Sequence, residues 1–449
     1  KALLPQTVVI LGGPEFLGDN EAYLRQHKEV DCVLRGEGEE SFARWLEVWD
    51  NRAEWGSVKG LCFNVNVNEE SLRGYENCHP DGNSEIITQK SEFNNLPDTN
   101  CQLSTVNCQL YHDGGLARVV DFAALRAPEE SDLFTWSKPF VQLETTRGCF
   151  NSCAFCVSGM GDPIRTLPID IIRHRLDRIR ERGIRDVRVL DRTFNYHPQR
   201  AIELMKLFAE YHPHLRFHLE IHPALLTQAV RQMLRDMPHG QLHLEAGIQS
   251  LRQEVLDKSL RKGSLEQALD GLRFLCSLPN LVTHADLIAG LPADNFDGFR
   301  YSLDSVAALN PANITVHTLA LKKGADLFER RQDLSTAQEV TRMVDYANAT
   351  LPQLGYKPYY LYRQKYMSGN YENVGYSRDG RDCLYNIYMM EELHPIVSLG
   401  GGGMSKVILS ENKLERFHNP KFPEQYIEQF DKVLAQKEQL CQLLKNIPV

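Results

Sequence analysis

The sequence of 449 residues has no long apolar run, no excess of basic residues and no second closely spaced pair of cysteines. No run approaches the roughly 20 apolar residues that a helix needs to cross a bilayer, so we expect no membrane partner. The segment from Lys1 to Pro5 lacks the apolar stretch of a signal peptide, and we expect a cytoplasmic protein. The formal net charge of −9 supplies no basic face, so we expect no nucleic-acid partner.

Three of the eleven cysteines are closely spaced along the chain. Cys149, Cys153 and Cys156 lie at spacings of four and three, directly after the strand-like segment 140–146. Thiolates are the usual ligands of iron–sulfur clusters, and three on one loop can hold three irons of a 4Fe–4S cube while the fourth iron stays open. The alternatives are a zinc site, which usually takes four ligands, and a disulfide, which three cysteines do not satisfy. The other eight are expected to be free thiols: Cys32, Cys62, Cys78, Cys101, Cys108, Cys276, Cys383 and Cys441.

The run 147–156, Arg-Gly-Cys-Phe-Asn-Ser-Cys-Ala-Phe-Cys, resembles the signature of the radical S-adenosylmethionine (SAM) enzymes. This resemblance implies that Cys149, Cys153 and Cys156 bind a 4Fe–4S cluster whose open iron binds SAM. It also implies cleavage of SAM to methionine and a 5′-deoxyadenosyl radical, which abstracts hydrogen from a small-molecule substrate. Phe155 is then expected to pack near the adenine, and an electron donor such as flavodoxin or ferredoxin is implied.

The first 50 residues favour part of a doubly wound, Rossmann-like α/β fold, because two strand-like segments alternate with two helical ones. Gly12-Gly13-Pro14 and the segment 36–40 resemble the last third of a cobalamin-binding domain. The Asp-x-His-x-x-Gly motif of such domains, whose histidine can ligate cobalt, does not occur in the sequence. Cobalamin therefore stays an alternative that no cobalt-ligand motif supports, beside a truncated sheet that packs on the enzyme core.

The remaining chain is predicted to form three further segments. Residues 51–135 are polar and predict an irregular connector with a few hairpins, for example a strand over 60–67. Over 136–325, six strands alternate with helices of 10–15 residues, which indicates a parallel sheet and a partial (β/α)6 barrel of the TIM type. Residues 326–449 are expected to form a smaller α+β domain. The predicted fold class is therefore α/β.

Polar residues follow successive predicted strands, where parallel folds place their chemistry. We predict cofactor contacts at Asp191, Thr193, Glu220, Glu245, Gln249, Ser250 and the turn at Gly290, and a tentative substrate contact at His222. Each has a structural alternative, such as capping the next helix. The radical SAM resemblance implies that the segment 191–195 meets the methionyl amine of SAM. It further implies that Gln249 and Ser250 meet the ribose and that the Gly290 backbone meets the adenine.

Two family resemblances meet in the second half of the chain. Residues 136–310 resemble cobalamin-binding-type radical SAM proteins through the segments 189–195, 217–223, 245–250 and 284–292. From about 313 the chain is similar to the oxygen-independent coproporphyrinogen III dehydrogenases, in the segments 314–323, 358–370, 372–376, 385–387 and 398–406.

The second resemblance implies the oxidative decarboxylation of two propionates to vinyl groups. Arg363, Lys365 and Lys406 could then pair with propionates. Tyr362, with three neighbouring tyrosines, could contact a flat tetrapyrrole, and the alternative is a tyrosine-rich packing layer. Phe150 and Phe155 stand where that family has proline and tyrosine, which tells against the porphyrin interpretation.

The sequence therefore predicts a radical SAM enzyme with an unidentified substrate. Three alternatives stay open. One is a coproporphyrinogen III dehydrogenase-type oxidative decarboxylase. The second is a cobalamin-dependent methyltransferase or methylthiotransferase. The third is a haem or iron–sulfur carrier without turnover.

Overall fold

The computed structural model describes residues 7–13, 16–66, 109–132, 134, 136, 138–158, 163–322, 324–331, 333–363, 366–390, 395–398, 400–410 and 413–445. The chain divides into two compact units, residues 1–125 and 126–449. Among the described residues, no helix combines the length and the apolar character needed to cross a membrane.

The first unit is built on a small sheet. In its described part, four strands lie in the order β1 (Ile10–Gly12), β2 (Cys32–Leu34), β3 (Leu61–Asn66) and β4 (Gln109–Asp113), with helices α1 (Glu21–Gln26) and α2 (Gly38–Val48). The β1–β2 pair is parallel, and the other two pairs are antiparallel. Trp45, Trp55 and Phe63 are buried together between sheet and helix. The range 51–135, predicted as an irregular connector, thus supplies two of these strands, β3 and β4. β3 pairs with β2, which comes from the first 50 residues.

A larger mixed sheet forms the centre of the second unit. Within the described ranges it has eight strands, in the order β13-β14-β12-β11-β10-β9-β8-β5. The strands are β5 (Phe140–Leu143), β8 (Asp186–Val189), β9 (Arg216–Ile221), β10 (Leu242–Gln249), β11 (Val282–Ala289), β12 (Asn313–Thr318), β13 (Lys357–Tyr362) and β14 (Asn373–Ser377). Neighbours from β5 to β12 pair in parallel, and β14 pairs antiparallel with both β12 and β13. The predicted α/β class with a parallel sheet is confirmed.

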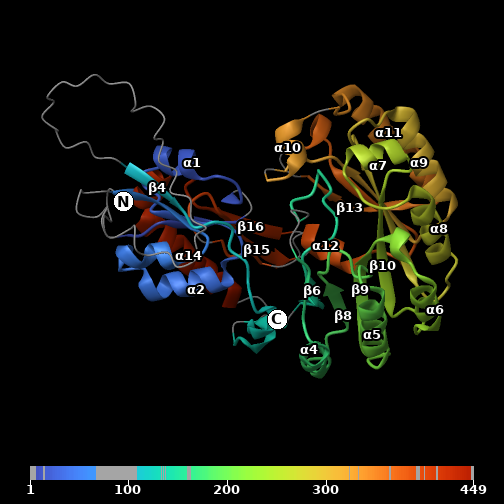
Figure 1. Cartoon of the computed structure of the whole chain (residues 1–449), viewed down its shortest axis with the longest axis horizontal. Helices are drawn as coiled ribbons and strands as arrows, with labels where there is room; N and C mark the ends of the chain where they lie inside the picture. The colour runs from blue at the N-terminus through green and yellow to red at the C-terminus, as the bar shows by residue number, and fades with distance from the viewer. Residues whose placement is uncertain are drawn as a thin grey trace, which may run out of the picture. The chain divides into compact units, whose positions relative to one another are not determined.

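Helices connect the parallel strands and lie along one side of the sheet (Figure 1). They are α4 (Ile169–Glu181), α5 (Pro198–Ala209), α6 (Gln228–Asp236), α7 (Gln253–Lys258), α8 (Leu265–Cys276) and α9 (Phe296–Ala308). After β12, the chain forms α10 (Asp326–Arg330), α11 (Ala337–Gln353) and α12 (Leu384–Met390). In α4, Ile172, Leu176 and Ile179 are fully buried. Their spacing of four and three places them on one helical face, which packs on the apolar sheet.

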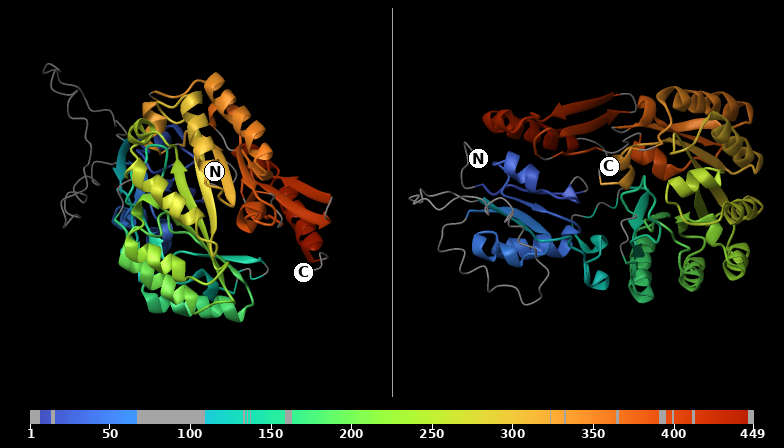
Figure 2. Two further views of the ribbon diagram at one scale, coloured as in Figure 1. Left: turned by 90° about the vertical axis from the view of Figure 1, so that its right-hand side faces the viewer. Right: turned by 45° about the horizontal axis from the view of Figure 1, so that its top comes forward.

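The chain beyond residue 325 both extends the sheet and adds a hairpin. β13 and β14 come from the range predicted as a separate C-terminal domain, yet β14 pairs with the edge of the parallel strands at β12, and β13 pairs with β14. The hairpin of β15 (Met404–Ser410) and β16 (Lys413–His418) is followed by α13 (Pro423–Glu428) and α14 (Phe430–Lys445) (Figure 2). Val407, Phe417 and Leu440 form its small core. The independence of the four predicted domains stays a prediction.

A buried ion pair ties the chain before β5 to helix α4. The Arg175 guanidinium donates to the Glu129 carboxylate at 2.7 and 3.1 Å, and both side chains are buried. Glu129→Ala should therefore lower the free energy of unfolding by about 3–5 kcal/mol, because it leaves an uncompensated buried charge. Urea unfolding followed by tryptophan fluorescence measures this loss.

The matched control removes an exposed residue that forms an ion pair with an arginine of the same helix α4. Glu210 pairs with Arg173 of α4 at 2.5 Å, with both side chains about half exposed. Glu210→Ala should shift the urea midpoint far less, because solvent screens this pair. Equal shifts for the two variants would contradict a structural role for Glu129.

Candidate functional site

A cavity of about 180 Å³ lies at the carboxyl ends of the parallel strands. It brings together residues from four predicted strand ends and from the cysteine loop. The predicted residues that line it are Cys149, Cys153, Phe155, Cys156, Thr193, Glu220, His222, Glu245 and Gln249. They are joined by Asn151, Ser158, Arg192, Ile221, Gly247, Arg261 and Asp286. We call this space the cysteine cavity.

The loop that carries the three cysteines is fixed by residues far along the chain. The amide of Ala154 donates to the Ser259 carbonyl at 2.9 Å, and the amide of Leu327 donates to the Ala154 carbonyl at 2.8 Å. The side chain of Asn151 accepts from the Lys262 amide at 3.0 Å. Because these bonds come from separate parts of the fold, the loop is held to the sheet on more than one side.

Two of the cysteine sulfurs have polar neighbours from other elements. Cys149 Sγ lies 3.8 Å from Thr193 Oγ1, and Arg261 Nη1 lies 3.8 Å from Cys153 Sγ. Burial raises the pKa of the Cys153 thiol, and the Arg261 guanidinium opposes that shift. A cation beside a thiol favours the thiolate, which is the form that binds metals.

The donor set fits a cluster bound through one sulfur per iron. In the described part of the chain, no three cysteine, histidine or carboxylate side chains converge as the ligands of a single metal ion would. Three thiolates on a 4Fe–4S cluster bind three different irons, so the thiols of Cys149, Cys153 and Cys156 need not converge on one point.

Unsatisfied polar atoms in the same cavity also indicate a ligand. Both ring nitrogens of His222 and the Oε1 atom of Gln249 are buried without a hydrogen-bond partner. A buried polar atom without a partner costs free energy, so a bound group that supplies partners would stabilise the site. Burial, followed by the charge of Arg261, lowers the pKa of His222 to about 3, which keeps its ring neutral.

A layer of buried charges forms the base of the cysteine cavity. The Arg188 guanidinium, on β8, donates to Glu220 at 2.6 Å and to Glu245 at 2.9 Å, on β9 and β10. His218 Nε2 lies 2.8 Å from the same Glu245 carboxylate. Burial acts to raise the pKa of Glu245, but Arg188 and His218 outweigh it and hold that pKa well below its usual range. Of the two glutamates that Arg188 contacts, Glu245 is therefore the one that is firmly ionised.

The two neighbouring acids behave differently. Burial and the negative charge of Glu245 raise the pKa of Glu220 to about 7, although Arg188 opposes the shift. Burial and both glutamates likewise raise the pKa of Asp286 well above its usual range. The cavity therefore combines one firmly ionised carboxylate with two acids that hold a proton more readily.

Gln249 is directed into the cavity by an irregularity at the end of β10. Its φ angle of 69° lies in the left-handed region, and the register with β11 shifts between Gly247 and Gln249. A bulge of this kind re-aims the side chain that follows it. A Cβ atom at Gly247 would lie 2.5 Å from the Gln249 amide nitrogen, so a glycine leaves room for this side chain.

Three predicted cofactor residues do not line the cysteine cavity. Asp191 is buried and accepts hydrogen bonds from the backbone amides of Thr145 and Thr146 at 2.8 and 2.9 Å, and from the Thr145 hydroxyl. Ser250 accepts from the Arg252 amide at 3.3 Å. These carboxylate and hydroxyl groups fix backbone at the strand ends. A Cβ atom at Gly290, whose φ angle is 90°, would lie 3.0 Å from Val340.

The predicted substrate residues of the C-terminal segment lie apart from this cavity. Tyr362 and Arg363 are exposed and are not among its lining residues. Lys365 falls outside the described residues. Tyr360 is buried, and its ring occupies the space where a Cβ atom of Gly375 would lie, so it packs within the sheet.

The structure adds charged residues that the sequence reasoning did not select. Arg188 interrupts an apolar strand, which is a signal of a buried ion pair. Arg261 follows α7 in a polar segment and reaches the Gly247 carbonyl at 2.6 Å. No local pattern distinguishes Arg261 from other surface arginines.

Parts of the chain are similar to known proteins. Residues 143–306 match the family described as the Radical SAM superfamily. Over 192 residues the chain is 37% identical to the oxygen-independent coproporphyrinogen-III oxidase-like protein HemZ of Bacillus subtilis, covering 42% of this chain and 38% of HemZ. Over 297 residues it is 24% identical to a tRNA-2-methylthio-N(6)-dimethylallyladenosine synthase of Pseudoalteromonas atlantica, covering 62% of this chain and 59% of the synthase. The chain thus spans less than two thirds of these relatives.

A solved structure shows the same general fold. It is the radical SAM methyltransferase TsrM of Kitasatospora setae, with a TM-score of 0.50 and 14% identity, covering 84% of this chain and 69% of TsrM. The cofactors of the superfamily are a 4Fe–4S cluster and SAM, and the three thiols of the cysteine cavity suit that cluster. By this match, residues 143–306 of the chain form a radical SAM domain.

Proposed function

We propose that this protein binds a 4Fe–4S cluster through Cys149, Cys153 and Cys156, cleaves SAM and abstracts hydrogen from a small-molecule substrate. The observation that carries the proposal is the cysteine cavity, in which these thiols meet the polar ends of the parallel strands. When bound, the cluster and SAM would supply the electron and the hydrogen-abstracting group. An electron donor such as flavodoxin or ferredoxin belongs to the proposal.

The side chains of the cavity would then bind and orient SAM. Glu220 and Gln249 line the cavity and offer a carboxylate and an amide to polar groups of SAM. Phe155, which packs against buried apolar residues, would contact the adenine. Asp191 would act indirectly, because it fixes the backbone of Thr145 and Thr146, between β5 and the cysteine loop, to the end of β8.

The fold would exclude water from the reaction. We propose that the six parallel strands curve into a partial (β/α)6 barrel whose mouth holds the cysteine cavity, and their order along the chain supports this. His222, Ser250 and Gly290 would close the region around the substrate and the cofactor. A dry site matters because a carbon radical reacts with whatever group lies beside it.

A second candidate function is favoured by one specific observation. HemZ, which is named as an oxygen-independent coproporphyrinogen-III oxidase-like protein, is 37% identical to this chain over 192 residues. We therefore propose coproporphyrinogen III as the first substrate to test, with oxidative decarboxylation as the reaction. Methyl or methylthio transfer, as in the names of the synthase and of TsrM, is the rival class.

The cluster ligands can be tested one at a time. In Cys149→Ala, Cys153→Ala or Cys156→Ala, the brown chromophore of anaerobically reconstituted protein and the release of 5′-deoxyadenosine should both be lost. Each of the three thiolates binds a different iron, so one missing sulfur removes a ligand that the others cannot replace. Absorbance near 400 nm and chromatography of SAM products measure the two effects.

Cys441→Ala is the matched control, because this free thiol is exposed on α14. It should keep the chromophore and the product. A cysteine-loop variant that retains both would overturn the proposed cluster ligands. A native protein that binds the cluster but yields no 5′-deoxyadenosine would instead favour the carrier alternative.

SAM binding should depend on pH through Glu220. Because the pKa of this acid is raised to about 7, its side chain is neutral below that pH and negative above it. SAM carries a positive sulfonium, so its affinity should rise about tenfold as the pH increases through 7, the size of one charge-assisted contact. Equilibrium dialysis of SAM between pH 6 and 8 measures the effect.

Glu220→Gln should remove this pH dependence. Glu254→Gln, at an exposed position on α7, should leave it unchanged. If Glu220→Gln keeps the native pH profile, Glu220 is not the titrating group.

The substrate class can be separated by product analysis. With coproporphyrinogen III, SAM, dithionite to reduce the cluster and a separate electron acceptor, the second candidate predicts vinyl groups in place of two propionates. Each of these propionates would lose one hydrogen atom to the 5′-deoxyadenosyl radical, then CO2, and one electron to the acceptor. Anaerobic mass spectrometry detects this change. Release of 5′-deoxyadenosine without any change in the porphyrinogen would exclude this substrate and keep the superfamily assignment.

A further inference from the structure

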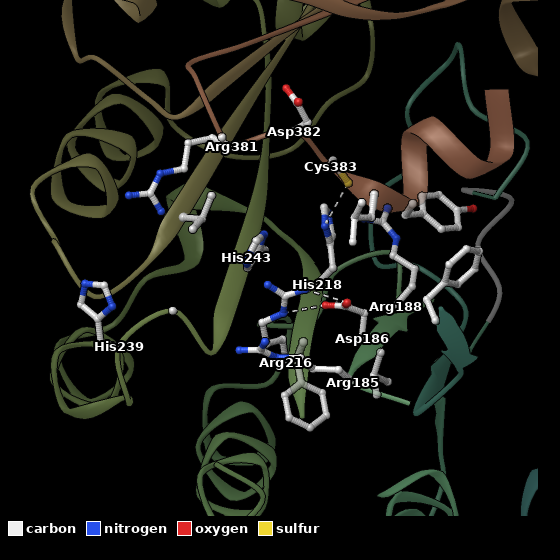
Figure 3. Close-up of a pocket in the computed structure, with 18 residues that line it drawn as sticks. Arg185, Asp186, Arg188, Arg216, His218, His239, His243, Arg381, Asp382 and Cys383 are labelled. Carbon is white, nitrogen blue, oxygen red and sulfur yellow. Dashed lines mark hydrogen bonds and ion pairs between the residues drawn. The ribbon is translucent and has the colours of Figure 1, made fainter. Parts of the chain in front are cut away.

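A second and larger cavity lies at the opposite ends of the parallel strands. It has a volume of about 600 Å³ and is lined by residues near the starts of β5, β8, β9, β10 and β11 and by the segment 380–385 after β14. Figure 3 shows that Arg381, Asp382 and Cys383 approach it from this segment, while Arg216 and His243 approach it from the strands. We call it the arginine cavity. Its volume is in the range of small-molecule sites.

The charges around the arginine cavity are unbalanced. The described lining residues include four arginines and two aspartates. Arg216 is paired with Asp186 through bonds of 2.7 and 2.8 Å, and Arg188 is paired with the glutamates of the cysteine cavity. Arg185 and Arg381 are exposed and have no ion-pair partner among the described residues. Asp382 bonds to the Ser377 hydroxyl instead.

Apolar side chains provide the other part of the lining. Phe140, Val187, Phe217 and Val282 are buried at the starts of their strands. Tyr385 adds a ring beside Phe140, with the ring centroids 5.5 Å apart. A space with aromatic walls and cations near its entrance suits a molecule with an apolar body and one anionic end.

The buried histidines add uncharged polar groups to this lining. Burial is the main cause that lowers the pKa of His218 to about 4 and that of His243 to about 3. Both rings are therefore neutral near pH 7 and leave the positive charge to the arginines. His218 is already bonded to Glu245 and lies 3.6 Å from Cys383 Sγ, so His243 is the freer of the two for a ligand.

We propose that the arginine cavity is a binding site for an aromatic organic anion, with its ring against Phe140 and Tyr385 and its carboxylate or phosphate held by Arg185, which directly precedes the Asp186 that pairs with Phe140 in the sheet. An oxyanion there contacts a guanidinium that has no carboxylate partner among the described residues. The ring covers apolar surface that would otherwise stay in contact with water. This site is separate from the cysteine cavity, because the two share no lining residue.

Calorimetric titration with matched probes tests the proposal on the full reconstituted chain. The probes are 1-naphthyl phosphate, 1-naphthoate and uncharged 1-naphthol. At least one of the two anions should bind with one-to-one stoichiometry and at least about tenfold more tightly than the naphthol, because a charge-assisted hydrogen bond carries that difference. Preference for the phosphate or for the carboxylate identifies the natural anionic group.

Two variants locate the binding. Arg185→Gln should weaken the anion at least about tenfold and leave naphthol binding unchanged. Arg273→Gln, at an exposed position on α8 outside both cavities, is the control and should bind as the native protein does. The proposal is overturned if neither anion binds, if naphthol binds as tightly as the anions, or if Arg185→Gln keeps the native affinity.

Discussion

The buried guanidinium of Arg188 between Glu220 and Glu245 is the interaction on which the candidate site depends. It joins β8, β9 and β10, and it allows two acids to stand on neighbouring strands in a space that water reaches poorly. Without Arg188, the carboxylates of Glu220 and Glu245 would repel each other, and each would be costly to ionise. The same arginine lines the arginine cavity, so one charged layer forms a wall of both spaces.

This wall gives the two cavities a physical link. His218 lines the arginine cavity, and its ring touches the Glu245 carboxylate of the cysteine cavity. A charge that approaches Arg188 or His218 from one side therefore acts on the acids at the other side. In a low-dielectric interior such an effect is stronger than it would be in water.

Much of the fold and part of the site could be predicted from the sequence. The alternation of apolar strands with amphipathic helices correctly predicted the parallel sheet. Because parallel strands end at one edge, the predicted strand ends also identified Glu220, Glu245 and Gln249, which line the cysteine cavity. Asp191 shows the limit of that logic, since its carboxylate binds backbone amides. Arg261 lay beyond prediction because it reaches the site across a long sequence separation. The pairing of β14 with β12 likewise depends on contacts that no local pattern records.

The anchors of the cysteine loop bear on when the cofactor can be loaded. The loop at 149–156 is bonded to the backbone of Ser259, Lys262 and Leu327, which are more than a hundred residues downstream. A ribosome makes those partners only after the thiols have left it. Until then the nascent chain exposes three thiols on an unanchored segment. On the proposed ligand set, iron delivery to the assembled site would follow translation of the sheet, and a chain that stalls before Leu327 lacks that anchor.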